Sequence, residues 1–148
     1  MTDYRRPLAL VLPGLLPWTV VTWPTGFYLV FAFGWTGQGF RGFQALPTVA
    51  AATGGTTVPW VVGTLLYCLA LVSAALSLVD REDRRVTAGL LYFAGASVVV
   101  FSLRLSGQSG ILAIPLGVLT LWLSATYVYR DRFPWASAVV GRLGAGQK

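Results

Sequence analysis

The sequence predicts an all-α membrane protein with four transmembrane helices in an up-down bundle. Hydrophobic residues make up 55% of the 148 residues and charged residues 11%, whereas about a quarter of a soluble domain is charged. Four apolar runs are each long enough to cross a bilayer as a helix, which takes about 20 residues. Charged residues gather between and after these runs, most densely at residues 80–85. We therefore expect one integral membrane domain over residues 1–148.

The first predicted span covers residues 8–34 and contains no charged residue. Three prolines, which kink a helix and free backbone carbonyls, lie within it: Pro13, Pro17 and Pro24. In lipid the freed carbonyls need other donors, and the nearest hydroxyls are those of Thr19, Thr22 and Thr25. A kinked packing helix is the favoured interpretation, and a broken helix that lines a site is the alternative. The span is too long for a signal peptide and lacks a cleavage site close behind it.

The second and third spans are predicted at residues 58–79 and 86–105, joined by a charged cytoplasmic loop at 80–85. Before them, residues 35–57 form a glycine-rich outer loop with a segment that we expect on the membrane surface, carrying Phe40, Phe43, Leu46 and Val49. A phosphate-binding loop would need a strand before the glycines and a helix after them. The sequence shows neither, so the glycines are not interpreted as a phosphate site.

The fourth span is predicted at residues 111–129, with a kink at Pro115 and a short interfacial helix after it. Small residues recur along this span at helical spacing: Gly110, Ala113, Gly117, Thr120 and Ser124. Shorter stripes occur in the second span (Gly63, Ala70, Ala74, Ser77) and in the third (Ala88, Gly95, Ser102). Such faces allow helices in lipid to approach closely. They either close the bundle on itself or bind a protein partner or a second copy, which we expect besides the lipid bilayer.

Arginine and lysine set the predicted orientation, because cytoplasmic loops carry an excess of them. The residues that we expect to set the topology are Arg5, Arg6, Arg81, Arg84, Arg85, Arg130 and Arg132. With Arg142 and Lys148 they place nine cations on one side, against Arg41 and Arg104 on the other. Both termini are therefore predicted in the cytoplasm of a plasma-membrane protein. Arg104 lies close to the outer end of its span and is expected to extend to water, or alternatively to contact outer-leaflet headgroups.

Residues that could carry catalysis are scarce. The chain has no His, Cys68 is the single cysteine, and no predicted span contains Asp, Glu, His or Lys. Metal sites built on His or several Cys are therefore excluded, and neither an enzyme nor a cofactor is expected. The basic net charge of +6 is explained by topology, so no nucleic-acid partner is expected. We predict a non-enzymatic interaction or accessory subunit. The alternative is a small channel or carrier for a neutral or apolar solute, lined by Thr19, Thr22, Thr25 and Trp23.

A resemblance to a known group of proteins rests on four features. They are the Arg5-Arg6 pair, the Leu16-Pro17-Trp18 step, the short Arg/Asp loop and the arginine-rich end of the last span. In these the chain resembles small uncharacterised four-helix membrane proteins of haloarchaea. The resemblance implies a membrane location and an archaeal-like source. It implies no activity and no functional residues.

Overall fold

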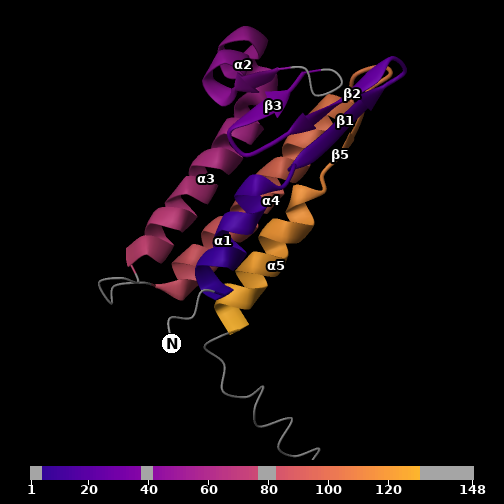
Figure 1. The fold of residues 1–148 in the computed structure, drawn as a ribbon. Coiled ribbons are helices and arrows are strands. Elements are labelled where there is room, and N and C mark those ends of the chain that lie inside the picture. Colours follow the sequence, from indigo (N-terminus) through magenta and orange to yellow (C-terminus); the bar gives the residue numbers. More distant parts are fainter. Residues whose placement is uncertain (1–4, 38–41, 77–82, 131–148) are drawn as a thin grey trace, which may run out of the picture.

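The computed structural model describes residues 5–37, 42–76 and 83–130, and shows a mixed α/β fold. The strands of this part form one five-stranded antiparallel sheet in the order β4-β3-β2-β1-β5. Long helices lie side by side, and the sheet and α2 lie at one end of them (Figure 1). The predicted all-α four-helix bundle is therefore wrong. The first and fourth predicted spans each divide into a helix and strands, because prolines interrupt both.

The first predicted span contains α1 (Arg5–Leu15), β1 (Thr19–Trp23), β2 (Gly26–Val30) and the start of β3 (Gly34–Thr36). Pro13 lies inside α1, as the kink prediction requires. Pro17 instead follows the end of the helix, because the residue before a proline avoids the helical conformation. The sequence Thr-Val-Val-Thr-Trp then favours a strand. Pro24 occupies the two-residue turn between β1 and β2, where Trp23 pairs with Gly26.

The predicted outer loop, residues 35–57, is largely structured. It contains the end of β3, then β4 (Phe43–Ala45), α2 (Leu46–Thr53) and the 3-10 turn η2 (Gly54–Thr57). The turn leads directly into α3 (Val58–Ala75), so residues 46–75 form an almost continuous helical segment. Pro59 lies in the first turn of α3, where a missing N–H costs nothing.

The third predicted span is helical over its whole length. It lies within α4 (Arg84–Ser106), which carries no proline. Asp83 caps this helix, and its carboxylate accepts a hydrogen bond of 3.0 Å from the backbone N–H of Arg85. Residues 80–82 of the charged loop, which include Arg81, lie outside the described residues. The same holds for Arg132 and the predicted C-terminal interfacial helix.

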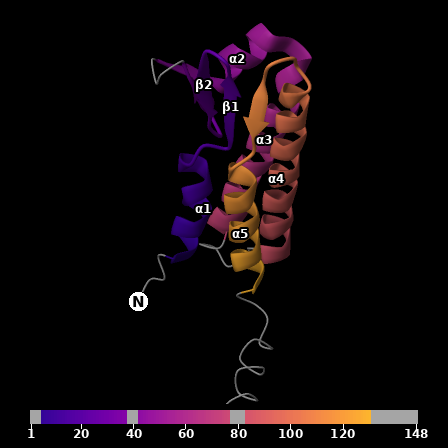
Figure 2. The ribbon, with the colours of Figure 1, turned by 90° about the vertical axis from the view of Figure 1, so that its right-hand side faces the viewer.

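The fourth predicted span begins as a strand. β5 (Leu112–Ile114) precedes α5 (Gly117–Arg130), and Pro115 lies between them, so it separates two elements and does not kink one helix. β5 pairs antiparallel with β1, with Val20 opposite Ile114. Figure 2 shows α5 running beside α1 below this strand pair. The predicted small-residue stripe is consequently not one helix face. Gly110 adopts a turn with φ of 78°, Ala113 lies in β5, and the other three residues lie in α5.

The core lies between the helices and beneath the sheet. Its largest fully buried side chains are those of Trp18, Trp60, Tyr67, Leu91 and Leu121. Trp18 and Tyr67 meet edge to face with their ring centroids 5.6 Å apart. A Cβ on Gly117 would lie 2.5 Å from the Cα of Trp18. The absence of a side chain at this glycine therefore allows α5 to begin directly against the chain between α1 and β1.

Candidate functional site: an aromatic pocket at the sheet end

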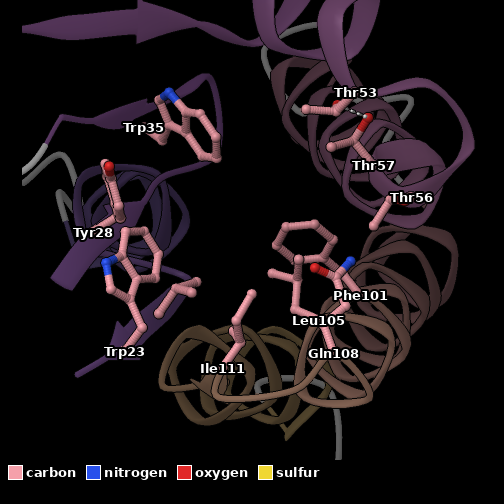
Figure 3. Close-up of a pocket in the computed structure, with 11 residues that line it drawn as sticks. Trp23, Tyr28, Trp35, Thr53, Thr56, Thr57, Phe101, Leu105, Gln108 and Ile111 are labelled. Atoms are coloured by element: carbon pink, nitrogen blue, oxygen red, sulfur yellow. Dashed lines mark hydrogen bonds between the residues drawn. The ribbon is translucent and has the colours of Figure 1, made fainter. Parts of the chain in front are cut away.

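A cavity of about 370 Å³ opens where the sheet faces η2 and the C-terminal end of α4 (Figure 3). We call it the aromatic pocket. Its lining residues are Val21, Trp23, Tyr28, Trp35, Thr53, Thr56, Thr57, Phe101, Leu105, Gln108 and Ile111. Binding sites for small molecules have volumes of roughly 300–1,000 Å³ and are lined mainly by apolar and aromatic groups. The cavity meets both criteria.

The sheet supplies one wall of the aromatic pocket. Side chains two residues apart on a strand share a face, so Val21 and Trp23 point the same way from β1, and Tyr28 lies opposite Val21 on β2. Tyr28 is the centre of an aromatic row. Its ring centroid is 4.2 Å from that of Trp23 and 5.6 Å from that of Trp35. In Figure 3 the indole nitrogens of both tryptophans lie on the side away from the cavity, so their carbon rings face it.

Helix α4 and the turn after it supply the opposite wall. Phe101 is buried and packs against Trp60, with ring centroids 5.7 Å apart. Leu105 and Phe101 are one helical turn apart and therefore share a face of α4. Ile111 completes the wall from the segment that leads into β5. This wall is apolar throughout, so the two walls enclose a space between hydrocarbon and aromatic surfaces.

Besides the Tyr28 hydroxyl in the sheet wall, polar groups of the lining come from the threonines at η2 and from Gln108 after α4. Thr53 donates to the carbonyl of Val49 at 2.7 Å, and Thr57 donates to the carbonyl of Gly54 at 3.2 Å. Their hydroxyl hydrogens are thus already hydrogen-bonded to nearby backbone carbonyls. Across the described part of the chain, the Thr56 hydroxyl and the Gln108 carboxamide have no such protein partner. These two groups are available to a bound molecule.

The described residues that line the aromatic pocket carry no charge. Arg104, exposed in the last turn of α4, donates from Nη1 to the carbonyl of Gly55 at 3.3 Å, one residue before Thr56. Asp83, the acid within the described residues, lies at the far end of α4. No group of His, Cys, Asp or Glu in this part of the chain could hold a metal ion. The lining therefore combines a large apolar surface with a few hydroxyl and carboxamide groups, an arrangement suited to binding.

The solute pathway predicted from the sequence overlaps the aromatic pocket in part. Of its four predicted residues, Trp23 lines the aromatic pocket. Thr19 is buried elsewhere and shares a hydrogen bond of 3.2 Å with Ser102. Thr22 donates to the carbonyl of Leu112 at 3.3 Å, across the β1–β5 pair. The threonines therefore connect elements of the fold.

The carbonyls freed by the prolines also have other partners than the predicted threonines. Because Pro13 lacks an N–H, the carbonyl of Ala9 loses its helical donor, and the hydroxyl of Ser124 supplies one at 2.7 Å. Pro17 leaves the carbonyl of Pro13 without a donor in the same way, and Trp18 Nε1 donates to it at 2.8 Å. The hydroxyl of Tyr67 donates to the carbonyl of Leu10 at 2.7 Å. These bonds bind the broken segment to α3 and α5.

The small-residue stripes face neighbouring parts of the same chain. A Cβ on Gly63 of α3 would lie 3.4 Å from the indole of Trp18 and from Ser97. A Cβ on Gly95 of α4 would collide with the indole of Trp122. Thr120, from the predicted stripe of the fourth span, donates to the carbonyl of Gly117 at 2.9 Å. Gly63 and Gly95 therefore bring α3, α4 and α5 together within the protein, whereas the bond of Thr120 stays within α5.

Sequence reasoning missed most of the aromatic pocket, including Tyr28, Trp35, Phe101 and Gln108. One signal could have revealed its sheet wall. Two runs rich in β-branched and aromatic residues, 19–23 and 26–30, are separated by two residues that include a proline. This pattern is typical of a β-hairpin. The long uncharged run around it favoured a membrane helix instead.

Comparison with known proteins identifies the family to which the chain belongs. The model of a family described as a domain of unknown function, DUF8050, matches residues 1–138. The chain therefore belongs to this family, which is uncharacterised. Neither the curated proteins nor the solved structures include a match to the chain.

Proposed function

For this member of the DUF8050 family, we propose an integral membrane protein that acts by binding and not by catalysis. The observation that carries the proposal is the apolar outer surface of the helices. Large apolar side chains are exposed on each long helix, including Leu65 and Leu69 on α3, Phe93 and Leu103 on α4, and Leu119 and Leu123 on α5. Soluble monomers rarely expose connected apolar patches larger than a few hundred Å². Lipid acyl chains are the natural neighbours of such a surface.

Two helical segments have the length and composition to cross a bilayer. Residues 46–75 and 84–106 each reach a mean hydropathy of 1.9 over 18 residues. Only 33% and 44% of these windows are buried within the protein, whereas the core helix of a soluble protein is mostly buried. At 1.5 Å per residue, the 23 residues of α4 extend about 34 Å, compared with a hydrocarbon core of about 30 Å. We therefore propose that α3 and α4 cross the membrane as a helical hairpin.

The shorter helices and the sheet need a different placement. The 11 residues of α1 and the 14 of α5 extend about 16 and 21 Å, too little to cross alone. They pack beside the α3–α4 hairpin at its arginine-rich end. An open sheet edge facing lipid would leave backbone groups unsatisfied. The sheet and α2 therefore lie in the headgroup region or in water on the other side.

Charge supports one orientation. The described cations of the sequence-predicted inner side begin α1 (Arg5, Arg6), begin α4 (Arg84, Arg85) or end α5 (Arg130). Figures 1 and 2 place these helix ends at the end of the molecule opposite the sheet. Arg104 lies at the sheet end. By the excess of positive charge in cytoplasmic segments, the arginine-rich end is cytoplasmic and the aromatic pocket faces outward.

The packed interior favours a binding or carrier role over an open channel. Trp18, Trp60 and Tyr67 are fully buried between the helices and fill the space that a pore would need. A carrier of a neutral solute stays the second candidate, and the aromatic pocket is the observation that favours it. A protein partner stays a prediction, as does the haloarchaeal source suggested by the resemblance.

Cysteine accessibility tests the membrane location. Cys68→Ser removes the single cysteine, and Phe93→Cys, Ser109→Cys and Arg85→Cys are then made one at a time. Phe93 is 68% exposed in the middle of α4, so the described part of the protein would not protect a cysteine there from water, whereas lipid would. We expect a membrane-impermeant maleimide to label Ser109→Cys on intact cells and Arg85→Cys only after permeabilisation. Phe93→Cys should label only in detergent-denatured protein.

Rapid labelling of Phe93→Cys in native protein would mean that this helix face is in water, and the proposal would be wrong. Labelling of Arg85→Cys on intact cells would keep the membrane location and reverse the orientation. Resistance of the protein to extraction with alkaline carbonate provides an independent measurement of integration. Each cysteine variant is compared with the Cys68→Ser parent for expression.

A further inference from the structure

We propose that the aromatic pocket binds a neutral molecule with a flat conjugated ring and an oxygen atom that accepts a hydrogen bond. This inference goes beyond membrane integration. The pocket is formed by the fold alone, so its ligand can be tested whether or not the helices cross a bilayer. Three properties of the lining select the ligand: the shape of its walls, its free hydrogen-bond donors and the sign of the nearest charge.

The walls favour a flat ring. On one side, Trp23, Tyr28 and Trp35 form a continuous row, with ring centroids 4.2 and 5.6 Å apart. On the other side, Phe101 and Leu105 face this row across the cavity (Figure 3). Stacked and edge-to-face ring contacts add to the gain from apolar burial. A molecule that fits between these walls gains most when it is planar and unsaturated.

The polar groups of the lining favour an oxygen acceptor on that ring. Thr53 and Thr57 direct their hydroxyl hydrogens to backbone carbonyls. Within the described residues, Thr56 and Gln108 retain free donors, a hydroxyl and a carboxamide, in the lining of the same cavity. A carbonyl or hydroxyl oxygen on the ligand would accept from either group. A pure hydrocarbon would leave both donors unused.

The surrounding charge excludes an ionic ligand. Aromatic clusters also bind quaternary ammonium groups through cation–π contacts. Here the nearest described charge is the guanidinium of Arg104, held on the carbonyl of Gly55, and it would repel a cation. An anion would be attracted by Arg104 at this range, but it would lose its hydration without contacting a charged partner, because Arg104 lies outside the lining and no described lining residue is charged. A neutral ligand avoids both costs.

Fluorine NMR of protein labelled with 5-fluorotryptophan tests the inference, with 1,4-naphthoquinone as the probe. Trp23 and Trp35 line the aromatic pocket, and their resonances are assigned with Trp23→Phe and Trp35→Phe. Trp122, 41% exposed on α5, reports non-specific partition into detergent. We expect saturable shifts of the Trp23 and Trp35 resonances, at probe concentrations that leave the Trp122 resonance unchanged. Equal shifts of all three, or none, would overturn the proposal.

Matched probes separate the three properties of the ligand. Naphthalene keeps the flat ring without oxygen, and 2-adamantanone keeps the carbonyl without the flat ring. We expect naphthalene to bind roughly three- to tenfold more weakly than naphthoquinone, the range for one net hydrogen bond, and 2-adamantanone more weakly still. Trimethylphenylammonium tests for a cation site. If it or 2-adamantanone bound as tightly as naphthoquinone, the proposed ligand class would be wrong.

Variants locate the oxygen contact. Gln108→Leu and Thr56→Val each remove one free donor, and Ser109→Ala is the matched control in the same turn, outside the pocket lining. We expect the first two changes to weaken naphthoquinone binding by roughly three- to tenfold and to leave naphthalene binding unchanged. Unchanged naphthoquinone binding in both variants would refute the oxygen contact. An unshifted Trp60 resonance in each variant shows that the core has folded.

Discussion

Helix α4 and the segment from α1 through β2 are similar in hydropathy and differ in structure. Both come from apolar runs long enough to cross a bilayer as a helix, and the run of α4 carries arginines only at its two ends. α4 is continuous over Arg84–Ser106, whereas the other run forms an 11-residue helix and a hairpin of strands. Hydropathy therefore identified where apolar segments lie and did not determine their backbone conformation. The prolines, together with the β-branched residues after them, made the difference.

The two regions also satisfy their backbones differently. α4 satisfies most of its own groups internally, with Asp83 as its cap. The broken segment depends on donors from elsewhere in the chain: Ser124 on α5 for the carbonyl of Ala9, and Tyr67 on α3 for that of Leu10. Its strand β1 is paired on both sides, by β2 and by β5. We therefore expect the broken segment to be the more sensitive to substitutions in other elements.

The largest expected effect concerns two glycines, one in α5 that packs against the broken segment and one in α4. Gly117→Ala places a Cβ 2.5 Å from the Cα of Trp18, a backbone atom that cannot move aside independently. We expect a loss of about 2–3 kcal/mol in the free energy of unfolding, typical of overpacking. Gly89→Ala in α4 is the control, since nothing lies within 4 Å of its new Cβ. Gly89→Ala should raise the free energy of unfolding by up to about 1 kcal/mol, because alanine has the higher helix propensity.

Denaturant titration in mild detergent, followed by circular dichroism, measures both glycine variants. If Gly117→Ala and Gly89→Ala had equal effects, the close contact between α5 and Trp18 would not contribute to stability. The contrast between the broken and the continuous segment would then have to be abandoned at this position.

A smaller effect is expected from the side chains that serve the freed carbonyls. Ser124→Ala removes the donor to the freed carbonyl of Ala9, and Tyr67→Phe removes a side-chain donor to the carbonyl of Leu10. A buried polar group without a partner costs about 1–3 kcal/mol, so each variant should unfold at a lower denaturant concentration. Ser97→Ala on α4 is the matched control, because the Ser97 hydroxyl has no partner among the described residues. A loss with Ser97→Ala as large as with Ser124→Ala would contradict this account.

The smallest effect is expected at the cap of the continuous helix. Asp83→Ala removes the carboxylate that accepts from the N–H of Arg85 at 3.0 Å. Loss of an N-cap costs typically about 1 kcal/mol, and here it should destabilise α4 without disturbing the broken segment. Asp83→Asn retains an oxygen acceptor and should restore most of the stability. Hydrogen exchange of the first turn of α4 measures the change locally, and unaltered exchange in Asp83→Ala would exclude a capping role.

Part of the fold could be predicted from sequence because it depends on local properties. The third predicted span lies within a helix, since residues 86–105 contain no proline and follow a good capping residue, Asp83. Residues 58–75 of the second predicted span form α3, which begins after Gly54-Gly55 and carries Pro59 in its first turn. Arg104 is exposed in the last turn of α4, and its extension to water at the outer membrane face stays a prediction. Each of these features follows from neighbours in the chain.

The division of the first and fourth predicted spans was decided by tertiary contacts. The prolines indicated only that these runs could not be regular helices. Whether each became a kinked helix or a helix followed by strands depended on partners far away in sequence. β1 finds β5 some 90 residues later, where Thr22 pairs with Leu112. A strand gains its hydrogen bonds only from such a partner, so no local pattern could establish it.

The aromatic pocket shows the same limit. Each residue of its two walls is an ordinary apolar or aromatic residue in the sequence, and none has a motif around it. Sequence alone determined the apolar character of the chain, the distribution of its arginines, the scarcity of catalytic groups and the positions where helices must break. Only the tertiary structure brought Trp23, Tyr28 and Trp35 against Phe101 and Gln108. The physical reason is that composition and backbone chemistry act locally, whereas a cavity requires surfaces from distant segments to face each other.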